Sequence, residues 1–173
     1  VLELAQRATL DDIESTMRAQ DTSAYNPFVL LAMDVNAGFA AQAGDDGLAI
    51  VPLSDGVHAV TNWSLDDQNH PKSRRALSLA AATDIAQGDD LALVERLHLL
   101  LSEHAPGERG NDGGLCVHRP DERYGTRSSA VILLDRAGGA RFFYSNGHPC
   151  ENRMAEVSGL LRREDSARAG VER

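Results

Sequence analysis

The strongest constraint on the fold is the order of the apolar segments, which form two groups of short strand-like runs with helical segments before and between them. Within each group the runs are joined by turn residues, such as Asp45-Asp46-Gly47 and Ala137-Gly138-Gly139. Strands joined by short turns pair antiparallel, and helices that are separate from them in sequence pack on the sheet faces. The order therefore predicts an α+β fold with antiparallel sheets flanked by helices.

The first group is predicted to be a meander of antiparallel strands. Residues 28–35 are almost continuously apolar and too few for a typical buried helix, which predicts a strand buried on both faces. Ser54-Asp55-Gly56 has the composition of a hairpin loop. The predicted strands of this group are residues 28–35, 39–43, 48–53 and 57–62.

The second group is predicted to contain a hairpin and two shorter strands. Residues 119–124 are rich in charge and predict a turn between the first two segments, whereas residues 105–114 have the composition of a flexible loop. The predicted strands of this group are residues 115–117, 129–135, 140–145 and 157–161.

The helices are predicted from apolar spacing and from capping residues. Residues 1–20 are predicted to be helical, with Thr9 as an N-cap inside the segment. Pro71 is a favourable first helical residue, and the helix that it begins is predicted to end near residue 86. Asp89 or Asp90 is predicted to cap the last helix, residues 91–104.

Composition limits the classes of function. The 173-residue chain has a net charge of −9, whereas non-specific binding to nucleic acid or to anionic membranes needs a basic surface. No apolar run reaches the roughly 18 residues of a membrane span. Two cysteines make no disulfide framework, so a reducing, cytoplasmic location is predicted. We expect residues 1–161 to form one domain and residues 162–173 to form a flexible tail.

Two polar residues at the ends of predicted strands are candidates for chemistry. Asn62 follows a strand, where its amide can donate to a developing oxyanion or simply cap a turn. Arg127 precedes a strand in the segment Tyr-Gly-Thr-Arg-Ser-Ser, where its guanidinium can orient a thiolate or carboxylate. On position alone, a turn cap and a surface arginine are the favoured interpretations.

Two short His/Cys pairs raise the question of a metal. Cys116 and His118 lie two residues apart, as do His148 and Cys150, and such residues face the same side of a strand. The four side chains could converge on zinc if the two segments were neighbours. The spacings differ from those of the usual zinc motifs, so we expect no metal site, and we interpret Cys116 as a small core residue.

Several blocks of the sequence resemble the NRDE family, which is also called the transport and Golgi organisation protein 2 family. The resemblance covers about residues 1–143, and the order and spacing of the blocks agree with it. The most specific of them is the Tyr-Gly-Thr-Arg motif between a Cys-Val segment and a strand. The resembling segments are residues 25–34, 57–62 with 71–75, and 115–117 with 124–129 and 131–135.

The resemblance implies a fold related to the N-terminal-nucleophile hydrolases, a four-layer αββα sandwich, of which this chain would supply the C-terminal part. It implies an amidohydrolase-type activity, in which a terminal Cys attacks an amide. The Met-Cys start and the Asn-Arg-Asp-Glu motif of the family are absent, so the nucleophile is expected outside this chain. By analogy, Asn62 and Arg127 are the predicted catalytic residues.

The same family resemblance implies an alternative, a non-catalytic protein that binds and traffics haem, an acyl-CoA or a lipid. Haem would need an axial ligand, for which His58, His70, His118 and His148 are the candidates. In both cases the partner is a small molecule. Sheets without their opening strands would have unpaired edges, so we expect an isolated fragment to self-associate.

Overall fold

The computed structural model describes residues 4, 9–61, 64–85, 88–105 and 113–161. The described residues form three α-helices and three small antiparallel sheets, which confirms the predicted α+β class. The chain divides into two compact units, unit 1 (residues 1–84) and unit 2 (residues 85–173). The single domain of residues 1–161 and its four-layer αββα arrangement stay predictions.

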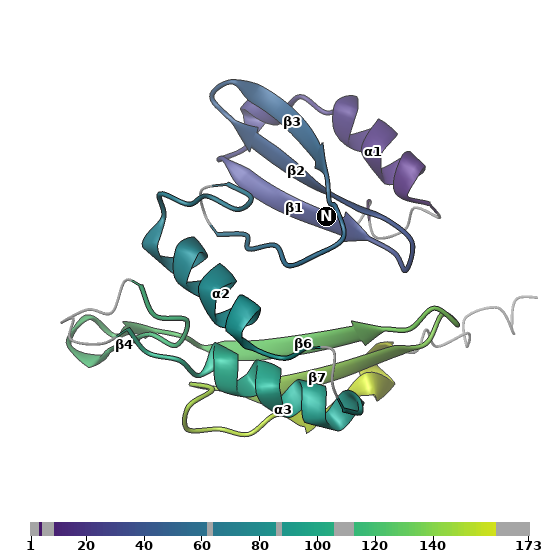
Figure 1. Cartoon of the computed structure of the whole chain (residues 1–173). Helices are drawn as coiled ribbons and strands as arrows, with labels where there is room; N and C mark the ends of the chain where they lie inside the picture. The colour runs from purple at the N-terminus through teal and green to yellow at the C-terminus, as the bar shows by residue number, and fades with distance from the viewer. Residues whose placement is uncertain (1–3, 5–8, 62–63, 86–87, 106–112, 162–173) are drawn as a thin grey trace, which may run out of the picture. The chain divides into compact units, whose positions relative to one another are not determined.

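Unit 1 contains a three-stranded antiparallel meander (Figure 1). Its strands are β1 (Phe28–Met33), β2 (Gly38–Gly44) and β3 (Gly47–Pro52), in the order β1-β2-β3. The turn into β3 needs Gly47, because its φ of +93° lies in the region that only glycine adopts freely. Three of the predicted strands of the first group are thereby confirmed.

The core of unit 1 lies on one face of this sheet. Helix α1 (Leu10–Arg18) places Met17 against Ala32, Phe39 and Ala41, and small alanines let the helix approach closely. The prediction that the first strand is buried on both faces is wrong. Leu31 and Met33 are 45% and 52% exposed, because alternate residues of β1 point away from this core.

The helix signals in the sequence are confirmed at their starts. Thr9 caps α1 by accepting a hydrogen bond from the Asp12 amide, and Pro71 opens α2 (Pro71–Ala82). In unit 2, Asp89 caps α3 (Asp90–Leu101), whose end lies three residues before the predicted one. No helix in the described part of the chain is both long and apolar enough to span a membrane.

Residues 57–61 do not form the strand that was predicted for residues 57–62, and a single bridge between Val60 and Leu65 is the only ladder contact that the described residues there make. The reason is a carboxylate that takes the place of a partner strand. Asp66 accepts a 2.7 Å hydrogen bond from the amide of Ala59, and its other oxygen lies 2.7 Å from Nδ1 of His58. Side-chain bonds of this kind compete directly with sheet pairing. Asn62 lies outside the described residues.

Unit 2 is built on a long hairpin of β6 (Ser128–Leu134) and β7 (Ala140–Asn146), extended by β8 (Ala155–Glu156). Helix α3 lies along this hairpin (Figure 1) and packs Val94 against Val131 and Phe143. A two-stranded ribbon of β4 (His118–Arg119) and β5 (Tyr124–Gly125) encloses a 3₁₀ turn, Pro120–Glu122, within the predicted charged turn.

Two predicted strands of unit 2 are wrong, and residues 162–173 lie outside the described residues. Residues 115–117 precede β4 rather than forming a strand, and Ser158–Leu161 is a 3₁₀ helix. The Ser158 hydroxyl accepts a 3.0 Å bond from the amide of Phe142. This side-chain bond takes the place of the next backbone hydrogen bond between β7 and β8, so the strand β8 ends after Glu156.

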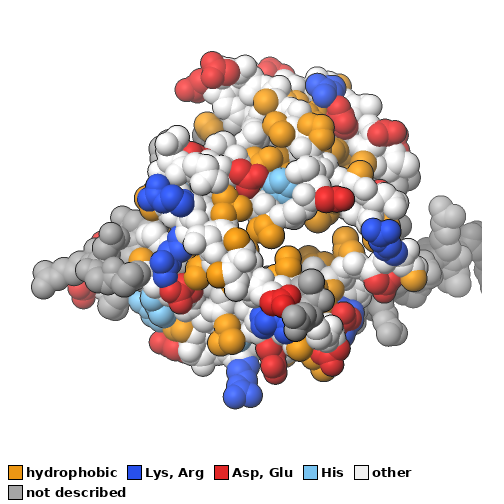
Figure 2. Space-filling model, in the orientation of Figure 1, with side chains coloured by type: hydrophobic (Ala, Val, Ile, Leu, Met, Phe, Trp, Pro, Cys, Tyr) orange, Lys and Arg blue, Asp and Glu red, His pale blue; other side chains and the backbone are white. Residues whose placement is uncertain are grey.

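Acidic and basic side chains are interspersed over the face shown in Figure 2. That face carries no single broad basic area of the kind that nucleic-acid binding requires.

The pair formed by His58 and Asp66 predicts a pH dependence of stability in unit 1. The hydrogen bond to Asp66, followed by that to the Ser54 carbonyl, raises the pKa of His58 above its usual 6.5. A raised histidine pKa stabilises the fold fully below the unfolded value, and this contribution is lost as the pH rises through the folded value. We expect H58Q to remove a stabilisation of under about 1 kcal/mol at pH 6 and to change little above pH ~8.

Urea unfolding followed by circular dichroism from pH 5.5 to pH 8.5 measures this difference. The matched control is H98Q, because His98 lies on α3 in unit 2 and has no carboxylate partner among the described residues. An equal loss of the free energy of unfolding in H58Q at pH 5.5 and at pH 8.5 would contradict the expected pH dependence.

Candidate functional site

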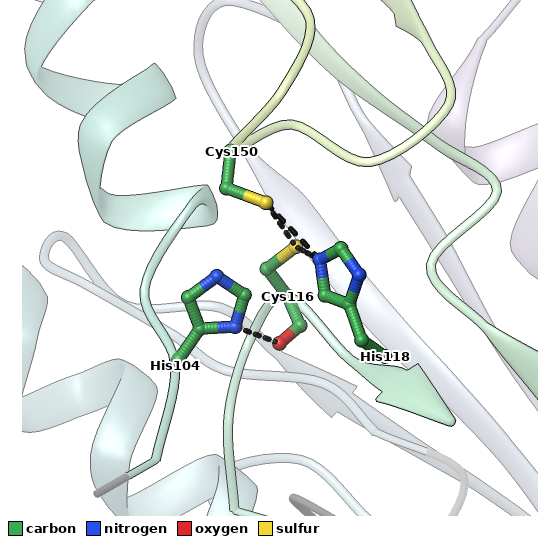
Figure 3. Close-up of side chains that lie close together, drawn as sticks. All are labelled: His104, Cys116, His118 and Cys150. Carbon is green, nitrogen blue, oxygen red and sulfur yellow. Dashed lines mark hydrogen bonds between the residues drawn. The ribbon is translucent and has the colours of Figure 1, made fainter. Parts of the chain in front are cut away.

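Four side chains of unit 2 converge at one point (Figure 3). Their ligand-type atoms all lie within 4.8 Å of one another. One residue follows α3, one precedes β4, one lies in β4 and one follows β7. The four, which we call the His/Cys cluster, are His104, Cys116, His118 and Cys150.

The atoms at the centre of the cluster are in contact. Sγ of Cys116 lies 3.6 Å from Sγ of Cys150 and 3.4 Å from Nε2 of His118. That nitrogen is also 3.1 Å from the sulfur of Cys150. Cys116 is fully buried, whereas His104 and Cys150 are exposed, so the cluster has a buried side and an open side.

Backbone hydrogen bonds bring these distant segments together. The carbonyl of Glu103 accepts from the amides of both Leu115 and Cys116, which places His104 beside Cys116. The amide of Thr126 donates to the carbonyl of Val117, which pairs β4 with β5. The chain then returns through Gly147, whose φ of +94° allows the sharp turn that carries Cys150 back to the cluster.

Each histidine of the cluster has one ring nitrogen directed to an oxygen. Nδ1 of His104 donates to the carbonyl of Cys116 at 3.0 Å, which leaves its Nε2 with the lone pair. Nδ1 of His118 lies 4.0 Å from a carboxylate oxygen of Glu151, so its Nε2 faces the two sulfurs. Histidines that bind metals are commonly held by hydrogen bonds to carbonyls or carboxylates, and His104 makes such a bond.

Burial shifts the pKa values of two members of the cluster, His118 and Cys150. Burial, followed by the nearby His148, lowers the pKa of His118, so its imidazole is neutral at pH 7. Burial and the neighbouring Cys116 raise the pKa of the Cys150 thiol to about 11. A thiol with so high a pKa is a poor nucleophile, because only the thiolate attacks. Neutral imidazoles and close thiols are instead the groups that bind a soft divalent metal.

A cationic pocket of about 260 Å³ adjoins the cluster. Arg119 contributes to it while paired with Glu122 at 3.1 Å and lying over the ring of Tyr124. Among the described residues, no carboxylate pairs with the guanidinium of Arg123 or Arg127. The residues that line the cationic pocket are His118, Arg119, Arg123, Tyr124, Gly125, Arg127 and His148.

The structure brings together some of the residues that the sequence singled out. Arg127 lies in the cationic pocket with His118 and His148, whose rings stack at 3.7 Å between centroids. His58 and His70 belong to unit 1. The two His/Cys pairs are neighbours, but Cys150 lies in a turn rather than a strand, so His148 stacks on His118 while Cys150 reaches the sulfur of Cys116.

His104 and the two further arginines of the pocket were not found from the sequence. His104 lies 12 residues before Cys116, with a loop between them, and no ligand spacing links the two. Arg119 and Arg123 were interpreted as parts of a charged turn. The signal that could have found them is the excess of arginine around the Tyr-Gly-Thr-Arg segment in an acidic chain.

Comparison with known proteins identifies a family for this chain. A family model described as Transport and Golgi organisation 2 matches residues 2–148, which is most of the chain. No curated protein and no solved structure matches the sequence. Three members of the His/Cys cluster lie inside the matched segment, and Cys150 lies two residues beyond it.

Gly125 lets β5 pack closely against Val117 and His148, which lie next to members of the His/Cys cluster. A Cβ atom at this position would lie 2.7 Å from the carbonyl oxygen of Val117 and 2.8 Å from Cε1 of His148. We expect G125A to lower the free energy of unfolding by about 1–3 kcal/mol, because backbone must shift to relieve the overlap.

Chemical denaturation of the whole chain measures this loss. G159A is the matched control, because a Cβ at Gly159 meets no atom within 4 Å. A G125A variant within about 0.5 kcal/mol of the unsubstituted chain would show that the β4–β5 ribbon adjusts freely.

Proposed function

This chain belongs to the Transport and Golgi organisation 2 family, and from that premise we propose that it binds a small anionic molecule in the cationic pocket. The observation that carries the proposal is the convergence of Arg123 and Arg127, neither of which is paired with a carboxylate among the described residues. A guanidinium presents a planar set of donors that matches a carboxylate or a phosphate in two parallel hydrogen bonds.

The charge of the chain makes this pocket distinctive. The chain as a whole has a net charge of −9, yet three arginines and two histidines line one small pocket. A cationic recess in an acidic surface concentrates anions locally and repels them elsewhere. The pocket therefore recognises a single anionic group of its ligand, and this recognition does not need a broad basic surface on the protein.

The size of the pocket defines how the ligand is held. Its volume of about 260 Å³ is below the roughly 300–1,000 Å³ of sites that enclose whole drug-sized molecules. It suits an anionic head group whose remaining part extends outside. Two of the non-catalytic ligands implied by the family resemblance have this form, since haem carries propionates and acyl-CoA carries phosphates. A cytoplasmic location is part of this proposal, because both cysteines stay available as thiols in a reducing compartment.

An amidohydrolase-type activity is the second candidate, favoured by the position of Arg127 in a pocket. In that reaction Arg127 would orient a substrate carboxylate, and Asn62 would donate to the oxyanion. Cys150 does not serve as the nucleophile, because burial and Cys116 raise the pKa of its thiol to about 11. The nucleophile is then a terminal Cys outside this chain.

Calorimetric titration with haemin and with coenzyme A tests the anion-binding proposal. We expect R127A to weaken binding of the preferred ligand by about 10-fold or more, because one charge-assisted hydrogen bond contributes about 1.5–3 kcal/mol. R127K should retain part of the affinity, because it keeps the charge but loses the planar fork. Binding should also weaken as salt concentration rises.

The matched control is R136A, because Arg136 is an exposed arginine in the turn between β6 and β7. Equal loss of affinity in R136A and R127A, or binding of neither probe by the unsubstituted chain, would contradict the proposal. Release of an amine from acyl-amide substrates by the protein with its terminal Cys, lost in R127A alone, would favour the hydrolase instead.

A further inference from the structure

We propose that the His/Cys cluster binds one Zn²⁺ ion in a closed tetrahedral site of structural type, with His104, Cys116, His118 and Cys150 as its ligands. The inference stands on the geometry of these side chains and does not depend on the anionic ligand of the neighbouring pocket. The two sulfurs and two imidazoles form the S₂N₂ ligand set that tetrahedral zinc prefers.

The distances among the two sulfurs and Nε2 of His118 are close to the edges of a zinc tetrahedron, and the ligand atom of His104 lies within 4.8 Å of each of them. Zinc bonds of about 2.3 Å to sulfur and about 2.0–2.1 Å to nitrogen give, at a tetrahedral angle, edges of about 3.8 Å between sulfurs and about 3.5 Å between sulfur and nitrogen. The Cys116 and Cys150 sulfurs are 3.6 Å apart. Nε2 of His118 lies 3.4 Å and 3.1 Å from them. The thiols and imidazole therefore already enclose a point at bonding distance.

The surroundings of both histidines agree with metal ligation. His104 donates its Nδ1 proton to the carbonyl of Cys116, and His118 directs its Nδ1 toward Glu151. A carbonyl and a carboxylate are the usual partners of the second ring nitrogen in metal-bound histidine, although Glu151 lies 4.0 Å away, beyond hydrogen-bond distance. The exposed side of the cluster, at His104 and Cys150, gives an ion a path from solvent.

The proton and charge balance of binding is complete. Zn²⁺ enters, the thiol protons of Cys116 and Cys150 leave to solvent, and two neutral imidazoles donate their lone pairs. The resulting centre has no net charge, because two thiolates offset the two charges of the ion. Four protein ligands leave no open position for a water molecule, so the centre is structural rather than catalytic.

The ion would join parts of unit 2 that the sheet does not join. His104 follows α3, His118 belongs to β4, and Cys150 lies in the turn after β7. His118 and the adjacent His148 also line the cationic pocket. Zinc would therefore fix one wall of that pocket.

A disulfide between Cys116 and Cys150 is the competing product. Disulfide sulfurs lie about 2.03–2.05 Å apart, whereas these lie 3.6 Å apart with Nε2 of His118 in contact with both. A disulfide gives the two imidazoles no role. The arrangement of the nitrogens thus favours the metal, and the intact mass distinguishes the two products.

The test uses the full 173-residue chain, purified under reducing conditions and without chelator. Elemental analysis should find about one zinc ion per chain. After removal of the metal, titration with Co²⁺ should give the intense ligand-field bands of tetrahedral cobalt together with a thiolate-to-cobalt charge-transfer band. Zn²⁺ should then displace the cobalt and bleach both signals.

Ligand variants identify the residues that bind. We expect C150S and H118Q to weaken zinc binding by more than the 10–100-fold that is typical of losing an outer partner of a ligand. The matched control H98Q should bind zinc as the unsubstituted chain does, because His98 lies on α3 outside the ligand set. Cys150 is exposed, so C150S should fold, and far-UV circular dichroism checks this.

Three outcomes would overturn the proposal. They are failure of the reduced chain to bind added Zn²⁺ or Co²⁺, equal binding by C150S, H118Q and the unsubstituted chain, and a mass lower by two hydrogen atoms, which would show a disulfide under the same reducing conditions. The anion titrations with haemin and coenzyme A are read separately, so failure of either proposal leaves the other measurable.

Discussion

Two hydrogen bonds to a single backbone carbonyl hold unit 2 in the form that its candidate site requires. The carbonyl of Glu103 accepts from the amides of Leu115 and Cys116, and so closes the loop that follows α3. Closing a loop costs conformational entropy that grows slowly with its length, and the burial of Cys116 offsets that cost. Because the closure places His104 against Cys116, the contact between these two members of the His/Cys cluster depends on it.

The sequence predicted local structure best where one signal sufficed. Turn residues located β2, β3 and the β6–β7 hairpin, and N-caps and Pro71 located the starts of the α-helices, because these signals depend on a few adjacent residues. The predictions failed at residues 57–61 and 158–161. There Asp66 and Ser158 take backbone amides that a sheet would otherwise use, and an apolar pattern does not reveal such a side-chain bond.

The residues of the candidate site also fall into those that the sequence could identify and those that it could not. Arg127 and the two His/Cys pairs could be singled out, because their residue types are unusual and close together in the chain. The contact between Cys150 and Cys116 and the position of His104 could not be predicted from the sequence. Both depend on contacts between residues that are far apart in the chain. The sequence showed which groups could do chemistry, and only the fold shows which of them are within bonding distance.

The His/Cys cluster and the cationic pocket share His118, so a charge placed in the cluster would act on the pocket. A centre of two thiolates and one divalent ion is neutral, so it adds little to the field of Arg123 and Arg127 nearby. Burial raises the pKa of the Cys150 thiol and lowers that of the His118 imidazole, so both groups favour their neutral forms. A cation would reverse the effect on Cys150 by favouring its thiolate, and would reinforce the effect on His118 by favouring the neutral imidazole. One bound ion would therefore suit the thiol and the imidazole that the fold brings into contact, and it would leave the arginines available to an anion.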